Sequence, residues 1–200
     1  LNNNLANTGG GLYARNTAIL IGPTLTNNYA SLGGGAYLNG TNIQATNVEL
    51  YDNQASAGGG FYNTGVATFI GGLVQNGTAF SGAGFFSAGP LTLTNVQVLG
   101  NTAQGNGGGG VNTGALTLTN VTFNTNKSTQ GDGGALVSSA NFTLNRGKFL
   151  GNSAPTGQGG ALWSNAAQVT LNNGLFARNT ALSGGAAIHM ALAGSQLNVR

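Results

Sequence analysis

Short stretches in which apolar and polar residues alternate recur along the whole chain. The clearest read LTLTNVQVLGN from Leu91, LTLTNVTFNTN from Leu116, FTLNRGKFLGN from Phe142 and VTLNNGLFARN from Val169. A period of two is typical of a β-strand with one buried face. No stretch shows the period of an amphipathic helix. The pattern therefore predicts an all-β protein.

These strand-like stretches belong to a repeat of about 25 residues. Glycine pairs or triplets, in one case Gly-Ala-Gly at Gly82, begin at Gly9, Gly33, Gly58, Gly82, Gly108, Gly133, Gly159 and Gly184, at spacings of 24 to 26 residues. Each repeat holds three short strand-like segments separated by Gly and Asn, which suits one turn of a parallel β-helix. We therefore expect residues 1–200 to form a single domain, a right-handed, single-stranded parallel β-helix (β-solenoid) of about eight turns of 24–26 residues.

Two columns of apolar residues are expected to fill the interior. The first strand contributes Leu93, Leu118, Leu144 and Leu171, with Leu91, Leu116, Phe142 and Val169. The second strand contributes Leu1, Leu25, Leu50, Leu73, Val98, Phe123, Phe149 and Phe176. Like side chains one turn apart should pack face to face.

An asparagine column follows the second apolar column at a distance of three residues. We expect an internal amide ladder at Asn28, Asn53, Asn76, Asn101, Asn126, Asn152 and Asn179. A buried amide without such partners would cost about 1–3 kcal/mol. A second asparagine set, Asn47, Asn95, Asn120 and Asn173, falls at the corner between the two strands, where Asn tolerates the left-handed conformation.

An aromatic column follows the glycine motifs. It comprises Tyr13, Tyr37, Tyr62, Phe86 and Trp163 and is interrupted at Asn112, Val137 and Ile188. If the preceding residues, such as Val111, point inward, the column lies outside. Two interpretations are open: the column stacks on sugars or on another rod, or it is partly buried beneath its own loop.

Threonines occupy the expected outward positions of the first strand. They are Thr92 and Thr94, Thr117 and Thr119, Thr143 with Asn145, and Thr170 with Asn172, and the pattern is interrupted at Gln44/Thr46 and at Ala67. A flat Thr-x-Thr ladder is what ice-binding β-solenoids use. External threonine is also ordinary in strands, so we hold ice binding as the least favoured alternative.

The charged residues are few and dilute. Nine of 200 residues are Asp, Glu, Lys or Arg, and the net charge of +3 is too dispersed for a nucleic-acid groove. Of the three acids, Glu49 and Asp52 share one repeat and Asp132 lies about three repeats away, so no triad of acids can converge. The single histidine, His189, has no Cys or carboxylate neighbour in its repeat. GDGGALV at Gly131 is similar to a calcium-binding nonapeptide but has a lone Asp. We expect no enzyme, metal or cofactor.

The Phe-x-x-Asn and Gly-Gly-Ala-Leu motifs carry a family resemblance. Phe123–Asn126, Phe149–Asn152, Phe176–Asn179, Gly133–Leu136 and Gly159–Leu162 match them, whereas the earlier repeats have Gly for Ala and Leu or Val for Phe. The chain thus resembles the polymorphic outer-membrane proteins of chlamydiae and the bacterial repeat proteins that share these motifs. The resemblance implies a secreted β-helix displayed on the cell surface and used for adhesion.

Further features agree with an extracellular location. The chain has no Cys, and no apolar run approaches the length of a membrane span. It begins within a repeat at Leu1 and stops at Arg200 in an expected strand, so we expect a fragment of a longer surface protein.

These observations predict a non-enzymatic structural or adhesive solenoid on a cell surface. The alternative is a self-assembling subunit of an extracellular fibre or sheath. The expected partners are other copies of the chain or a cell-surface or glycan partner, with no nucleic acid and no membrane span in this segment.

Overall fold

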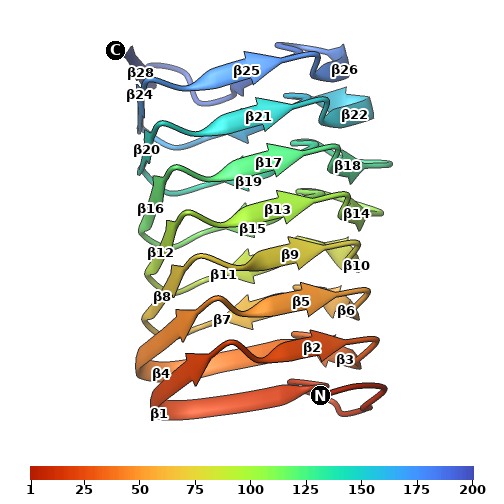
Figure 1. Cartoon of the computed structure of the whole chain (residues 1–200). Helices are drawn as coiled ribbons and strands as arrows, with labels where there is room; N and C mark the ends of the chain where they lie inside the picture. The colour runs from red at the N-terminus through yellow and green to blue at the C-terminus, as the bar shows by residue number, and fades with distance from the viewer.

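Successive turns of the chain stack into a β-solenoid of about eight turns without helices (Figure 1). The computed structural model describes all residues, 1–200. Every strand pair is parallel and joins equivalent positions of neighbouring turns, for example Leu116 with Phe142. Repetition at about 25 residues produces this arrangement, because each turn buries its apolar face only when its neighbours complete the core.

Each turn contributes strands to four rows, which we name by their side chains. The threonine row is β8 (Ala67–Ile70), β12 (Leu91–Thr94), β16 (Leu116–Thr119), β20 (Phe142–Asn145), β24 (Gln168–Asn172) and β28 (Gln196–Val199). The core row is β2 (Thr24–Thr26), β5 (Glu49–Tyr51), β9 (Leu73–Gln75), β13 (Gln97–Leu99), β17 (Thr122–Asn124), β21 (Lys148–Leu150) and β25 (Leu175–Ala177).

The short row and the aromatic row complete each turn. The short row is β3 (Tyr29–Leu32), β6 (Gln54–Ala57), β10 (Thr78–Ser81), β14 (Thr102–Ala103), β18 (Lys127–Ser128), β22 (Ser153–Gln158) and β26 (Thr180–Ser183). The aromatic row is β7 (Phe61–Asn63), β11 (Phe85–Ser87), β15 (Gly110–Asn112), β19 (Leu136–Ser138), β23 (Leu162–Ser164) and β27 (Ile188–Met190). The long strands β1 (Leu12–Ile21) and β4 (Ala36–Thr46) span the aromatic and threonine rows and join them into one sheet.

The interior is one continuous core of 31 buried residues. The predicted first-strand column is fully buried, as at Leu93, Leu118 and Leu144. The second column is buried from Leu25 to Phe149, with one correction: Val74, not Leu73, is in register with Leu50 and Val98. The stacked strands therefore share one core along the whole rod.

Residues with positive φ mark the corners. Asn47, Asn95, Asn120 and Asn173 have φ between 50° and 58°, as expected for the corner between the threonine and core rows. Arg146 adopts the same conformation at φ 53° in the one turn where Arg replaces Asn. Backbone of this hand costs a residue with a Cβ about 1–2 kcal/mol, which explains why Asn dominates the corner.

The glycine motif also turns the chain through positive φ. At Gly33, φ is +65° and an added Cβ would lie 2.2 Å from the carbonyl oxygen of Ala36, so no larger residue fits. The equivalent glycine in the fifth turn is Gly107, at φ +68°, rather than Gly108. Consequently the following strand is displaced by one residue from the predicted register.

No helix of the chain has the length and apolarity to cross a membrane.

Candidate functional site

The asparagine column forms an internal amide ladder. The Nδ2 of Asn126 donates to Oδ1 of Asn152 at 3.0 Å and to the Val98 carbonyl at 2.8 Å, and its Oδ1 accepts from the Asn101 main chain at 3.0 Å. The buried members are Asn28, Asn53, Asn101, Asn126 and Asn152, and Asn179 continues the ladder in part-buried form. Each buried amide is therefore paired between turns, a structural role that leaves no group free for a ligand.

Asn76 does not belong to the ladder, contrary to the prediction. It has φ 54° and occupies the corner that Gly100 occupies in the next turn, while Gly77 takes the ladder position. The main-chain N–H of Gly77 donates to Oδ1 of Asn101 at 2.8 Å. Asn and Gly both adopt the left-handed conformation, so this exchange leaves the backbone path intact and interrupts only the side-chain ladder.

A second buried polar ladder was missed by the sequence reasoning. It comprises Asn63, Ser87, Asn112, Ser138 and Ser164 at the end of the aromatic row, all 0% exposed. The Nδ2 of Asn63 donates to Oγ of Ser87 at 3.0 Å, and that hydroxyl donates to the Gly89 carbonyl at 2.8 Å. The spacing of 24 to 26 residues between these polar residues is a signal that could have found them. They tie the bend between the aromatic and threonine rows.

The aromatic column is a stack of rings along the rod. Ring centroids lie 5.1 Å apart between Tyr13 and Tyr37, 5.5 Å between Tyr37 and Tyr62, and 4.9 Å between Tyr62 and Phe86. The planes of neighbouring rings differ by 14° or less. The rings therefore cover one another's faces and present their edges outward, so the inner members of the stack offer no open face to a sugar ring.

Val137 interrupts the column as predicted, whereas the other two interrupting residues differ from the predicted ones. Val111 and Val137 follow Phe86 in register, and His189, not Ile188, follows Trp163. Asn112 instead belongs to the buried ladder, and Val111 points outward although only 7% of it is exposed. The displacement that brings Val111 into the column originates at Gly107. In the last turn, an extra residue in the bend after Gly184 brings His189 into the column.

The exposure of the column does not fully match either predicted alternative, contact with sugars or another rod on the one hand, or partial burial beneath its own loop on the other. Tyr13 at the base is 39% exposed, and Tyr37, Tyr62, Phe86 and Trp163 are half-buried. The column thus lies outside the core and is partly covered along its length.

The ionisation of the column depends on its neighbours. The Arg15 Nε donates to the Tyr13 hydroxyl at 3.1 Å, and this hydrogen bond, with a weaker contribution from Asn39, lowers the pKa of Tyr13. Burial, and to a lesser extent the adjacent Tyr37, raises the pKa of Tyr62. The pKa values of Tyr13 and Tyr62, two members of one stack, are therefore shifted in opposite directions.

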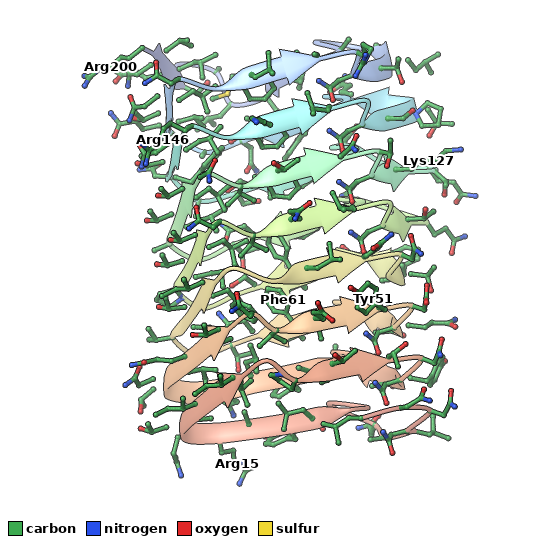
Figure 2. The ribbon with its side chains drawn as sticks, viewed as in Figure 1. Arg15, Tyr51, Phe61, Lys127, Arg146 and Arg200 are labelled. Atoms are coloured by element: carbon green, nitrogen blue, oxygen red, sulfur yellow. The ribbon has the colours of Figure 1, made fainter.

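The ionisable residues are scattered over the rod. Glu49 accepts a hydrogen bond from the Thr24 hydroxyl, and Oδ1 of Asp132 accepts from the main chain of Gln158 at 2.7 Å. Figure 2 shows Arg15 at one end of the rod, Arg146 on one side and Lys127 on the opposite side. No group of three or more His, Cys, Asp or Glu side chains could hold a metal ion.

The threonine row presents the longest regular surface column. Thr68, Thr92, Thr117, Thr143 and Thr170 occupy equivalent outward positions in five consecutive turns. Ala67, predicted to interrupt the pattern, is buried and points inward in register with Ile43 and Leu91. The column is consequently longer than the sequence suggested.

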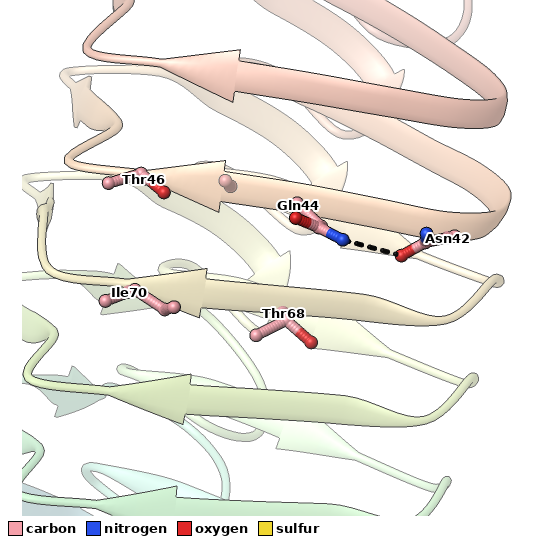
Figure 3. Close-up of a pocket in the computed structure, with 6 residues that line it drawn as sticks. Asn42, Gln44, Thr46, Thr68 and Ile70 are labelled. Atoms are coloured by element: carbon pink, nitrogen blue, oxygen red, sulfur yellow. Dashed lines mark hydrogen bonds between the residues drawn. The ribbon is translucent and has the colours of Figure 1, made fainter.

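Two shallow hollows lie along the same row. One lies between β4 and β8 and is lined by Asn42, Gln44, Ala45, Thr46, Thr68 and Ile70, with Gln44 donating to Asn42 (Figure 3). The other, lined by Thr119, Asn145, Arg146, Asn172 and Asn173, lies at the corner. The first has a mixed polar and apolar lining and the second a polar one. Neither contains a carboxylate, so neither has the acid pair that glycoside hydrolysis requires.

Comparison of the chain with protein-family models, with curated proteins and with solved structures found no match in any of the three.

Proposed function

We propose that this chain is a non-catalytic, extracellular β-solenoid that acts as a stalk or adhesive segment on a cell surface. The observation that supports the proposal most directly is the exterior of the rod, on which uncharged side chains form columns through successive turns. The threonine column runs through five turns and the aromatic stack through four rings. A repeated surface of this kind suits multivalent contact along a rod.

The placement of the acids supports the non-catalytic part of the proposal. Glu49 and Asp52 lie in one turn, whereas Asp132 lies about three turns away, on the order of 15 Å at the spacing of neighbouring strands. Asp132 is engaged with the main chain of the next turn. General acid and base catalysis requires two groups that reach the same bond. The three acids cannot converge, and the two that share a turn, Glu49 and Asp52, line neither of the hollows on the rod.

The proposal is tested by binding and by hydrolysis in parallel. The purified chain is applied to an array of neutral and acidic glycans and to intact cells, and the same glycans are assayed for new reducing ends. Binding without cleavage is the expected result. Cleavage of any glycan would overturn the non-catalytic assignment, and failure to bind both the array and the cells would overturn the adhesive role.

A fibre subunit is the alternative that the same preparation distinguishes. Light scattering and negative-stain electron microscopy report whether the chain stays monomeric. We expect single short rods. Long uniform fibres that grow from the purified chain alone would replace the adhesive proposal with assembly.

A further inference from the structure

The threonine row has two outward columns that together form a regular array. The first column is Thr68, Thr92, Thr117, Thr143 and Thr170. The second is Thr46, Ile70, Thr94, Thr119, Asn145 and Asn172. Full Thr-x-Thr pairs occur in β12 and β16, and their neighbours keep at least one threonine each. We call these two columns the threonine face.

The hydroxyl groups of this face are available to solvent. Several threonines elsewhere in the chain bond main-chain carbonyls, as Thr129 does with Ala103 at 3.2 Å. The hydroxyls of the threonine face have no hydrogen-bond partner within the chain, and their side chains are half-buried or exposed. Thr117, at the centre, is exposed. Each hydroxyl can therefore donate to and accept from ordered water.

The spacing of the array is set by the backbone. Neighbouring turns are about 4.8 Å apart, and the two outward positions of one strand are about 6.6 Å apart. The strands of the row lie one above another along one side of the rod, so the array repeats in a straight line (Figure 1). The hydroxyls therefore form a two-dimensional array with one repeat along the rod and one along each strand, as a surface that contacts a crystal lattice requires.

Charge is absent from the threonine face. From Gln44 to Asn172 neither column contains an Asp, Glu, Lys or Arg, and Arg146 lies at the adjacent corner. An ion on the face would order water around itself and disturb an ice-like arrangement. Half-buried methyl groups between free hydroxyls restrict water to the positions that the hydroxyls select.

We propose that the threonine face binds ice, with the rows of Thr hydroxyl and methyl groups ordering the first water layer into the ice lattice. Rigidity favours this role because the backbone ladder holds the side chains at fixed spacing before binding. The inference rests on the geometry of this face and is independent of the proposed adhesive role.

The experiment measures ice recrystallisation inhibition and thermal hysteresis with the full chain. Thr117→Tyr places a large ring at the centre of the threonine face. Thr102→Tyr makes the same change at an exposed outward position of the short row and serves as the matched control. Circular dichroism and the unfolding midpoint establish that both variants keep the fold.

We expect the unmodified chain and Thr102→Tyr to inhibit recrystallisation equally, and Thr117→Tyr to lose most of the inhibition. Thr117→Val, which keeps the shape and removes the hydroxyl, should lose only part of it. Absence of inhibition in the unmodified chain would overturn the proposal, as would equal inhibition by both Tyr variants. Pelleting with crystalline cellulose or chitin that Thr117→Tyr abolishes, without any effect on ice, would reassign the face to a polysaccharide lattice.

Discussion

At the scale of single residues, the solenoid depends on asparagines that pair between turns. In the ladder from Asn101 to Asn152, each side chain donates to the amide of the next turn and to a main-chain carbonyl of the turn before, and Asn179 accepts the last of these bonds. The same residue type at the corners instead supplies positive φ. One residue type therefore performs two different tasks, and position in the turn decides which.

Replacing one ladder amide should weaken the fold. Asn126→Ala leaves its neighbours in the ladder partly unpaired within the core, so we expect the free energy of unfolding to fall by about 1–3 kcal/mol. Asn124→Ala, at an outward position two residues away, is the control and should change it by less than about 0.5 kcal/mol. Urea unfolding followed by circular dichroism measures both. Equal effects of the two substitutions would contradict the ladder.

The tyrosine stack predicts a particular response to alkaline pH. The folded chain raises the pKa of Tyr62, so at neutral pH the phenol is neutral in both states. As pH rises through the ordinary tyrosine pKa of about 10, the unfolded state ionises first and stability is lost. The free energy of unfolding should therefore fall less between pH values of about 9 and 11 in Tyr62→Phe than in the unmodified chain.

Tyr13 supplies the control with the opposite sign. Its pKa is lowered by Arg15, so its ionisation in the folded state stabilises the chain as pH rises. Tyr13→Phe should make the alkaline loss of stability steeper. Urea titrations at the two pH values measure both variants, and identical slopes for the two would contradict the assigned shifts.

At the scale of the strands, the core row is stabilised by stacked rings. Phe149 lies between Phe123 and Phe176, with ring centroids 4.7 Å apart on both sides. In the fifth turn the aromatic row has Gly110, and the ring of Phe85 fills the space where its side chain would lie. Neighbouring turns thus compensate one another's volume, as close packing requires.

Truncation of one stacked ring should be costly. Phe149→Ala removes a fully buried ring and its contacts on both sides, so we expect a loss of about 3–5 kcal/mol in the free energy of unfolding. Leu150→Ala changes the adjacent, half-buried outward residue and should cost much less. Chemical denaturation compares the two. A cost for Leu150→Ala as large as that for Phe149→Ala would show that the assigned inward face is wrong.

At the scale of the whole molecule, stability is distributed over equivalent turns. Each turn contacts mainly its two neighbours, as the strand pairing shows throughout the rod. Such an architecture tolerates the removal of a complete turn, because the remaining columns join in register.

Deletion of residues 92–116 tests this modularity. It joins Leu91 to Thr117, and since Leu91 pairs with Leu116, the alternation of inward and outward residues is preserved. We expect a folded, shorter rod whose denaturant m-value is lower by about one eighth, in proportion to the surface buried. Deletion of residues 92–103, about half a turn, is the control and should abolish cooperative unfolding. A folded half-turn variant would contradict the dependence on register.

The sequence by itself determined the period, the parallel solenoid and most of the inward positions. Those features follow from apolar residues that recur at one spacing, such as Phe123 and Phe149, and no other arrangement buries them together. The amide ladder was predictable for the same reason, because a buried Asn must find hydrogen-bond partners at the equivalent position of the neighbouring turn.

Tertiary structure alone decided the local register and the character of the surface columns. Either Asn76 or Gly77 could have taken the corner, because both residue types tolerate its positive φ. Asn76 occupies the corner, and the same register places Val74 rather than Leu73 in the buried column. Consecutive glycines from Gly107 to Gly110 leave the next strand free to shift by one residue, because they contain no side chain to fix its position. The orientation of the Tyr37 and Tyr62 rings depends on contacts between turns, which no single repeat contains.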